Sequence, residues 1–291
     1  MFVFKAAVVG AGTMGGEIAQ VVASAGIPVV LKDIKQELVD AGLDKAREVT
    51  EARLGSLVSK EKITQEDADR QRDEILGRIS GVTAYEGFGD VDFVIEAVPE
   101  RMEIKQAVFA ELDEVTPGHA ILASNTSSLS ITEMAEATLR PDKVCGFHFF
   151  IPASVMRLIE VIEGEDTSDE TMQAAANFAQ ALRKTPVRCG EVPGFVVNRI
   201  LISSASEVWR VTEEEGLDPH EVDKAVQEAG AAPMGPFFLM DWSGLDTALH
   251  VAEYLRDSYG GERFYVMNRM KELVEAGNLG QKTGKGFYDH G

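Results

Sequence analysis

The sequence predicts an α/β protein that combines a doubly wound sheet, a projecting helical hairpin and an all-helical C-terminal domain. Three observations lead to this prediction. Short apolar strands alternate with helical patterns through roughly the first two-thirds of the chain, a strongly charged helical stretch interrupts them at residues 35–78, and no strand pattern returns after Phe195. A length of 291 residues suits two domains, which we expect to span residues 1–190 and 191–291.

The alternation begins close to the N-terminus. Residues 5–9 form an apolar run, residues 13–25 carry apolar side chains at helical spacing, and residues 29–31 form a second strand that ends at Asp33. Further strand candidates, separated by helical patterns such as residues 102–115, are residues 91–98, 119–124, 143–149 and 157–162. Continuous apolar strands of this kind favour a parallel sheet covered by helices on both faces.

The charged stretch at residues 35–78 is predicted to form two helices that project from the sheet. Thr64 and Asp67 have the spacing of a capping box and predict the start of the second helix. After Pro193-Gly194, which we interpret as a hinge, apolar residues recur at helical spacing, and the remainder of the chain is predicted to be helical.

Composition excludes some classes of partner. Lys and Arg total 28 against 48 Asp and Glu, and the net charge of −20 disfavours nucleic acid and anionic membrane surfaces. The start of the chain lacks a cleavable signal pattern, and no apolar run approaches the roughly 20 residues that span a bilayer. Cys145 and Cys189 are interpreted as reduced thiols, and we expect a cytoplasmic protein.

A glycine-rich turn follows the first strand. Gly10, Gly12 and Gly15 have G-x-G-x-x-G spacing, and Thr13 and Met14 open the helix that follows. Gly10 permits a tight turn, Gly12 lets a pyrophosphate approach the backbone, and Gly15 allows close packing of helix against strand. With a second strand after the helix, the whole context matches the dinucleotide-binding fingerprint of a Rossmann-type domain. A purely structural glycine turn is the alternative.

Asp33, at the end of the second strand, lies where an acidic residue receives the adenosine ribose hydroxyls. Its charge would repel a 2′-phosphate, so the sequence favours NAD over NADP. Lys32 and Lys35 lie nearby and weaken that preference.

His148 lies in an apolar strand candidate, and Glu160 lies in the next one. Oxidation of an alcohol needs a base for the hydroxyl proton, and imidazole suits this role because its pKa lies near neutral pH. A carboxylate on the other ring nitrogen would fix the tautomer and stabilise the imidazolium. The alternative is a hydrogen-bonded core histidine, with Glu160 in water at a strand end.

The motifs of the chain resemble the L-3-hydroxyacyl-CoA dehydrogenase family over nearly its whole length. They occur in the family's order and are GAGTMGGEIAQ, VIEAVPE, ASNTSSLSIT, GFHFF, MRLIEVI, PGFVVNRIL, PMGPF, GLDT and KTGKGFYD. The resemblance implies NAD-dependent interconversion of an (S)-3-hydroxyacyl-CoA and a 3-oxoacyl-CoA. It also implies an N-terminal NAD-binding domain and a C-terminal domain for substrate binding and homodimer formation.

The resemblance assigns roles residue by residue. It makes His148 the general base and Glu160 its partner, and it places Ser127 and Asn198 at the substrate's reacting oxygen. Further residues implied at the NAD site are Glu100, Lys105 and Lys282, and those implied at the CoA site of the hairpin are Lys60 and Arg53, the latter replacing the family's serine.

Each of these residues also has a plain structural interpretation. Ser127 could cap a turn, Asn198 could cap a helix, and Lys60 could belong to a solvated charged face. Ser130 and Glu133 have capping-box spacing and predict the start of the next helix.

Ile151 departs from the family pattern H-F-F-N-P, because this chain reads HFFIP. The asparagine of the pattern makes polar contacts near the nicotinamide that isoleucine cannot make. Cofactor positioning and catalytic rate are therefore expected to differ from those of the family.

Other functions remain compatible with the sequence. One is a dehydrogenase of a small hydroxy acid or sugar acid on the same fold. A second is a non-catalytic NAD-binding protein, which the joint presence of His148, Glu160, Ser127 and Asn198 disfavours. A third is an acyl-CoA carrier, which the glycine-rich turn disfavours.

Overall fold

The computed structural model describes residues 2–261 and 263–291. The chain divides into two compact units, one ending at Glu191 and the other spanning Val192–Gly291. Within the described residues, no helix combines the length and the apolar character that a membrane span requires.

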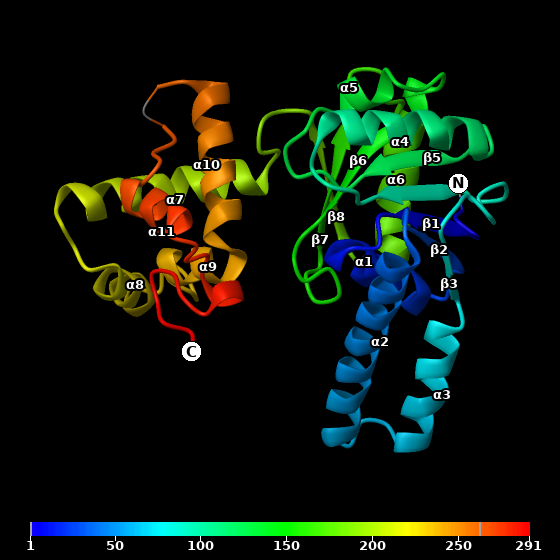
Figure 1. Cartoon of the computed structure of the whole chain (residues 1–291), viewed down its shortest axis with the longest axis horizontal. Helices are drawn as coiled ribbons and strands as arrows, with labels where there is room; N and C mark the ends of the chain where they lie inside the picture. The colour runs from blue at the N-terminus through cyan, green and yellow to red at the C-terminus, as the bar shows by residue number, and fades with distance from the viewer. Residues whose placement is uncertain (1, 262) are drawn as a thin grey trace. The chain divides into compact units, whose positions relative to one another are not determined.

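The first unit is built on an eight-stranded sheet with the order β3-β2-β1-β4-β5-β6-β7-β8 (Figure 1). The strands are β1 Ala6–Val9, β2 Val29–Lys32, β3 Ile79–Val82, β4 Phe93–Glu96, β5 Ile121–Ser124, β6 Val144–Phe149, β7 Leu158–Glu163 and β8 Thr185–Gly190. This is the doubly wound α/β architecture that the sequence predicted, because the strand order proceeds outward from β1 in both directions.

The sheet is mostly parallel, as the alternating strand and helix patterns suggested, but one of its strand pairs is antiparallel. Strand β7 runs antiparallel to β6, and β8 runs parallel to β7. The reason lies in the connection between β6 and β7, which is too short for the helical crossover that a parallel neighbour needs. Neither β3 nor β8 was among the strand ranges expected from the sequence, although Cys189 of β8 was expected in or beside a strand.

Helices cover both faces of the sheet. They are α1 Thr13–Ser24, α2 Gln36–Ser59, α3 Gln65–Leu76, α4 Met102–Val115, α5 Ile131–Ala135 and α6 Asp169–Ala181, with a 3-10 turn at Pro141–Lys143. One apolar core joins α1 and α6 to the strands, with Phe147 and Val161 among its members. Because side chains alternate along a strand, His148 and Glu160 point to the opposite face.

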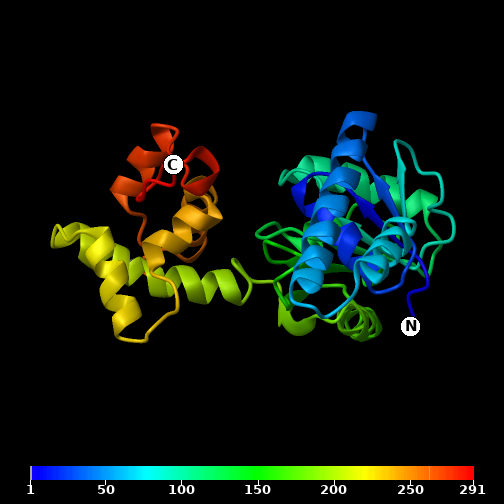
Figure 2. The same ribbon diagram turned by 90° about the horizontal axis from the view of Figure 1, so that it is seen from below.

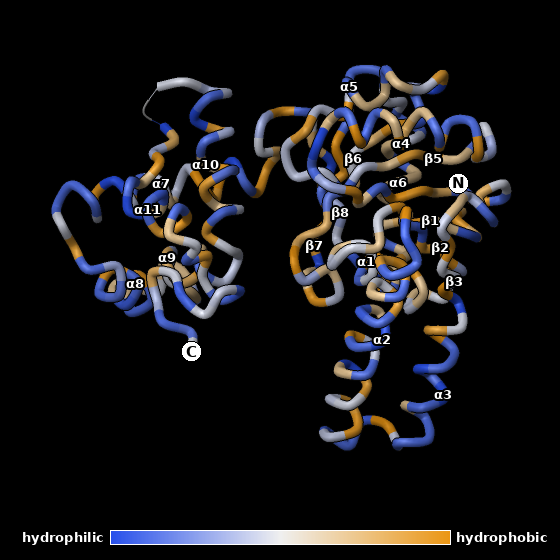
Figure 3. Tube along the Cα trace, viewed as in Figure 1, coloured by the Kyte–Doolittle hydropathy of each residue, from blue (hydrophilic) through white to orange (hydrophobic). Residues whose placement is uncertain are grey.

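Helices α2 and α3 pack against each other and form the predicted hairpin, which extends away from the sheet in Figure 1. Figure 3 shows hydrophilic residues along most of α3. The predicted helix starts are confirmed, because Thr64 and Ser130 are the N-caps of α3 and α5, and each side chain accepts a hydrogen bond from a backbone N–H, that of Asp67 and that of Glu133. Each bond satisfies a backbone donor that a helix start otherwise leaves unpaired.

The second unit consists of helices and loops, drawn in yellow to red in Figure 2. The helices are α7 Val197–Glu214, α8 Pro219–Glu228, α9 Pro236–Ser243, α10 Leu245–Tyr259 and α11 Asn268–Glu275, with a 3-10 turn at Gln281–Thr283. Its core surrounds Trp209, which is fully buried. The buried carboxylate of Asp241 accepts hydrogen bonds from the backbone N–H groups of Phe287 and Tyr288, and so holds the end of the chain against α9.

Candidate active site

The glycine-rich turn lies between β1 and α1. Gly10 has a φ of +100°, and a side chain there would meet the Ala97 carbonyl oxygen at 2.5 Å. A side chain at Gly15 would meet the Gly10 carbonyl oxygen at 1.7 Å, so α1 can approach β1 only with glycine at that position. At Gly12, by contrast, a side chain would meet no described atom within 4 Å. Gly10 and Gly15 shape the turn, and Gly12 leaves space beside its backbone.

That space lies at the start of α1, where Thr13 and Met14 form the first turn with Gly12 as the N-cap. The first turn contains no acidic residue. Backbone N–H groups and the helix dipole favour an anion there. These features fit the pyrophosphate of a dinucleotide despite the negative charge of the chain as a whole.

Asp33 is tied to the glycine-rich turn. Its Oδ2 accepts a hydrogen bond of 2.7 Å from the Ala11 backbone N–H, and its Oδ1 accepts one of 2.7 Å from Ile34. A carboxylate has about four acceptor positions, so capacity remains for ribose hydroxyls. The Lys32 ammonium lies 4.2 Å from the centre of the Tyr85 ring.

His148 and Glu160 form a directly opposed pair on β6 and β7. The His148 Nδ1 lies 2.8 Å from the Glu160 Oε2, and the two side chains are nearly or fully buried. The next residue, Phe149, donates its backbone N–H to the Asn125 Oδ1 at 2.8 Å and so fixes the end of β6. The structure therefore brings together the two residues for which the sequence suggested a shared role.

A second buried network lies at the ends of β4 and β5. The Lys105 Nζ of α4 lies 2.7 Å from the Glu96 Oε1 and 3.2 Å from the Glu100 Oε2, with Lys105 only 1% exposed. The Glu96 carboxylate also accepts hydrogen bonds from the Ser124 hydroxyl and the Val98 backbone N–H, each 2.6 Å long. Lys105 therefore directs its charge into the protein, between two carboxylates.

Glu100 connects this network to the loop that carries Ser127. Its Oε1 accepts a 3.0 Å hydrogen bond from the Ser127 backbone N–H and a 2.5 Å bond from the Thr126 hydroxyl. Burial favours a higher pKa, but the Lys105 ammonium and these donors hold the pKa of the Glu100 carboxyl below its usual range. Glu100 is thus a charged anchor for the Ser127 loop.

Glu96 and Asn125 are functional candidates that sequence reasoning missed. The sequence does indicate a role for Glu96, because a charged residue inside an apolar strand needs a partner. The spacing of residues gives no such indication for Asn125, since its contact with Phe149 depends on the pairing of β5 with β6.

Ile151 lies in the connection between β6 and β7 and is 59% exposed. The bond from Ile151 to Pro152 is cis. The apolar side chain therefore faces outward from the loop that follows the His148 strand.

Asn198 and Lys282 belong to the second unit. Asn198 lies in the first turn of α7, and Lys282 lies in the 3-10 turn at Gln281–Thr283. The Lys282 ammonium forms an ion pair with Asp246 in the first turn of α10. His148, Glu160, Ser127 and Glu100, by contrast, all lie in the first unit.

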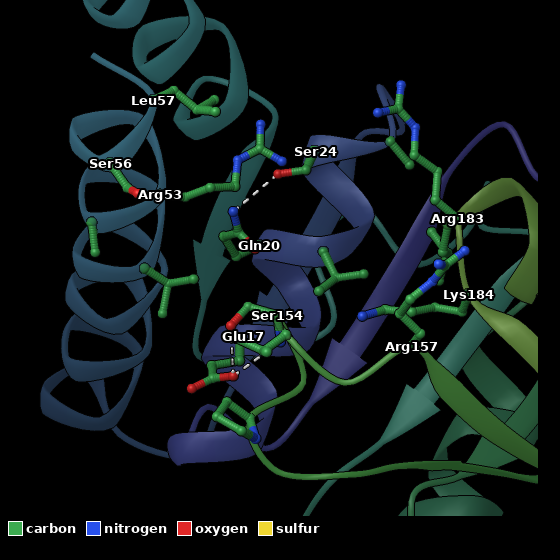
Figure 4. Close-up of a pocket in the computed structure, with 17 residues that line it drawn as sticks. Glu17, Gln20, Ser24, Arg53, Ser56, Leu57, Ser154, Arg157, Arg183 and Lys184 are labelled. Carbon is green, nitrogen blue, oxygen red and sulfur yellow. Dashed lines mark hydrogen bonds between the residues drawn. The ribbon is translucent and has the colours of Figure 1, made fainter. Parts of the chain in front are cut away.

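A groove of about 570 Å³ runs along the first unit (Figure 4). Its lining comes from α1, α2, the loop before β7 and the turn before β8, and includes Arg53, Arg157, Arg183 and Lys184. Of the two hairpin residues predicted at a CoA site, Arg53 lines the groove. Lys60 is the exposed residue that ends α2 and is not part of the lining.

Comparison with known proteins gives two family matches that together cover almost the whole chain. The family model described as 3-hydroxyacyl-CoA dehydrogenase, NAD binding domain, matches residues 5–192, and the corresponding C-terminal domain matches residues 194–290. The chain is 42% identical over 286 residues to a probable 3-hydroxybutyryl-CoA dehydrogenase of Deinococcus radiodurans, covering 98% of this chain and 100% of that protein. It is 41% identical to the 3-hydroxybutyryl-CoA dehydrogenase of Clostridioides difficile, covering 98% of this chain and 99% of that one.

Solved structures agree with these matches. The crystal structure of (S)-3-hydroxybutyryl-CoA dehydrogenase from Ralstonia eutropha has a TM-score of 0.90 and 38% identity, and the match covers 100% of both chains. The crystal structure of FadB2 from M. tuberculosis has a TM-score of 0.92 and 36% identity, again over 100% of both chains.

Proposed function

Because the chain belongs to the 3-hydroxyacyl-CoA dehydrogenase family, we propose that it acts on short (S)-3-hydroxyacyl-CoA thioesters and that His148 is its general base. NAD-dependent dehydrogenase activity follows from the family itself. The preference for short chains is supported by relatives that are named 3-hydroxybutyryl-CoA dehydrogenases.

The observation that carries the role of His148 is its contact with Glu160. A carboxylate 2.8 Å from Nδ1 holds the ring in the tautomer that donates from Nδ1, so that Nε2 takes and returns the substrate proton. Proton removal from the 3-hydroxyl creates an imidazolium, and the Glu160 charge stabilises it. In the reverse direction the same nitrogen returns the proton to the oxygen.

The cofactor is NAD, and the residues of the glycine-rich turn fit it. We assign the pyrophosphate to Gly10, Gly12, Thr13, Met14 and Gly15, and the adenosine ribose to Asp33. When bound, NAD supplies the acceptor for the hydride that leaves the substrate carbon. Glu100 and Lys105 are proposed to line the NAD site. Lys105 is held in place by its ion pairs with Glu96 and Glu100. On the basis of the family resemblance, we also assign Lys282 to the NAD site.

Ser127 and Asn198 are proposed to hold the substrate's reacting oxygen. A hydroxyl and an amide can both donate hydrogen bonds to a developing carbonyl or alkoxide oxygen. Support for Ser127 comes from its loop, which the charged Glu100 anchors. Arg53 and Lys60 are proposed to bind the CoA portion, with Arg53 supported by its place in the groove.

Reduction of acetoacetyl-CoA tests this function. Consumption of NADH, followed by its absorbance, is expected with acetoacetyl-CoA and not with a panel of sugar acids or small hydroxy acids. Turnover of a sugar acid without turnover of the thioester would contradict the proposal. Tight NADH binding without turnover of any compound would indicate a non-catalytic NAD-binding protein.

Asp33→Asn is expected to lower kcat/KM with NAD by about 10- to 100-fold, because the ribose loses a charge-assisted hydrogen bond. NADP use should rise, since the repulsive charge is absent. The amide oxygen can still accept from the Ala11 N–H, so the turn should persist. Asp33→Ala is the comparison that removes this bond as well. An unchanged ratio of NAD to NADP use in Asp33→Asn would show that another residue sets cofactor choice.

Ile151→Asn is expected to raise turnover or NAD affinity by roughly 2- to 13-fold, the range of one neutral hydrogen bond worth about 0.5–1.5 kcal/mol. The exposed position of Ile151 allows a polar side chain without repacking of the core. Steady-state kinetics with acetoacetyl-CoA and NADH measure the effect. No gain, or a loss, would mean that isoleucine is adapted to this site.

The quaternary state and cellular location are also proposals. We propose a homodimer formed through the helical unit, which is supported by the family resemblance and by the exposed apolar residues Ile200 and Val211 of α7. A cytoplasmic location is supported by the two cysteines, Cys145 and Cys189, which are both free. Sedimentation equilibrium measures the first, and a monomer at micromolar concentration would contradict it.

A further inference from the structure

The groove of the first unit concentrates positive charge in a chain whose net charge is −20. Arg53 comes from α2, Arg157 directly precedes β7, and Arg183 lies in the turn between α6 and β8. Figure 4 shows Arg53 on one side of α1, and Arg157 and Arg183 on the other side. Segments far apart in the sequence therefore contribute arginines to one groove.

These arginines form no ion pair within the described residues. All three residues are exposed, and within residues 2–261 and 263–291 none of their guanidinium groups has a carboxylate within 4.0 Å. Glu17 is the acidic residue in the described lining, and its carboxylate has other hydrogen-bond partners. Its Oε2 accepts hydrogen bonds from the Ser154 backbone N–H and hydroxyl. The arginines therefore remain available for an anion from outside the chain.

Lys184 differs from the arginines. Its Nζ donates to the carbonyl oxygens of Ala153 and Met156, at 2.5 Å and 2.7 Å. Burial also lowers the pKa of this ammonium. Lys184 thus fixes the loop that precedes Arg157, and its contacts assign it a structural role rather than a role in anion binding.

The backbone at Arg183 gives an independent indication of function. Its φ is +61°, in the left-handed region that favours glycine, at the turn that ends α6. An arginine there is strained, and its side chain makes no ion pair that would compensate for the strain within the described residues. A role in ligand binding explains why an arginine occupies a position suited to glycine.

We propose that Arg157 and Arg183, together with Arg53, which is already assigned to the CoA portion, bind the 3′-phosphate and diphosphate of the CoA thioester and make the enzyme select CoA over carriers that lack these phosphates. Guanidinium groups suit this task because they pair with phosphate oxygens through two parallel hydrogen bonds. Apolar residues of the same lining, among them Val21, Ala25 and Leu57, suit the uncharged part of the carrier. The inference rests on the proposed acyl-CoA function and specifies which residues recognise the carrier.

The test compares two substrates with the same reacting group. Acetoacetyl-CoA carries the phosphates, and acetoacetyl-pantetheine does not. Arg157→Gln and Arg183→Gly are each expected to raise KM for acetoacetyl-CoA about 10-fold. Their kcat should stay within about 2-fold, and KM for acetoacetyl-pantetheine should not change. The effect on acetoacetyl-CoA should also diminish as salt is added, because exposed charges are screened.

Two comparisons separate binding from structure. Arg47→Gln removes the same charge from the same helix as Arg53, at an exposed position outside the groove, and should leave both KM values unchanged. Arg183→Gly should raise the thermal midpoint, since glycine relieves the left-handed strain, while it weakens CoA binding. A residue with a merely structural role would not produce these opposite changes.

Calorimetry with free CoA and with 3′-dephospho-CoA provides a readout that does not depend on turnover. Weaker binding of CoA to Arg157→Gln and Arg183→Gly supports the inference even if the dehydrogenase assignment fails. Equal CoA affinity in the wild type, these variants and Arg47→Gln would overturn it. Equal increases in KM for the two thioesters would overturn it as well. Absence of turnover with either thioester in the wild type would instead refute the proposed activity.

Discussion

His148→Gln is expected to lower the turnover of acetoacetyl-CoA and NADH by roughly 100- to 10,000-fold, which is the usual contribution of a general acid or base. Glutamine is similar in size and can still hydrogen-bond to Glu160, which lies 2.8 Å from the His148 Nδ1. It cannot take up and return a proton near neutral pH. The loss should therefore appear in kcat rather than in the stability of the fold.

The measurement needs both cofactor affinity and turnover. NADH affinity, measured by fluorescence titration, should stay within about 2-fold, since NAD is assigned to the glycine-rich turn and Asp33. Glu160→Gln is the matched variant, because it keeps the shape of the pair and removes only its charge. It should also reduce kcat more than it reduces the thermal midpoint.

Two outcomes would contradict the role of His148. A decrease in kcat of only a few-fold in His148→Gln would mean that another group moves the proton. Normal turnover per folded molecule in Glu160→Gln, combined with a large decrease in thermal midpoint, would mean that the pair only stabilises the strands. In that case His148 would be the hydrogen-bonded core histidine that the sequence also allowed.

The sequence predicted the central strands because both of their faces are buried. Strands β1, β2, β4 and β5 are buried along their whole length and therefore read as continuous apolar runs. Strands β3 and β8 lie at the two edges of the sheet, where most of their residues are partly or fully exposed. Their sequences ISGV and TPVRCG lack an apolar run, so no strand pattern marked them.

Two parts of the site could be predicted from the sequence, namely the glycine-rich turn, from its spacing, and the contact between His148 and Glu160. His148 and Glu160 are ionisable residues in apolar strands, and such residues need partners, so the sequence alone suggested a pair. The anchoring of Ser127 by Glu100 could not be predicted, because it depends on the loops after β4 and β5 lying side by side. The arginine groove likewise joins separate segments that no sequence spacing connects.

Lys105→Met is expected to lower the free energy of unfolding by about 3–5 kcal/mol, the usual cost of removing one partner from a buried ion pair. Lys105 is 1% exposed and Glu96 is fully buried, so the Glu96 carboxylate would lose the ammonium 2.7 Å away and gain no water in its place. Burial already raises the pKa of Glu96, against the opposing effect of Lys105. Urea unfolding of the two proteins, followed by circular dichroism, measures the difference.

The double variant Glu96→Gln/Lys105→Met identifies the cause of that loss. Glutamine at position 96 carries no charge, its oxygen can still accept the hydrogen bond from the Val98 backbone N–H, and its amide N–H can donate to the Ser124 hydroxyl oxygen. Most of the lost stability should therefore return. If the single variant is as stable as the wild type but binds NADH more weakly, the ammonium acts mainly on the cofactor, as the family resemblance implies. Stability and NADH affinity could instead both decrease in the single variant and both recover in the double variant. In that case Lys105 affects NADH binding indirectly, because it stabilises the fold around the NAD site. The ion pairs of Lys105 with Glu96 and Glu100 lead us to expect the latter result.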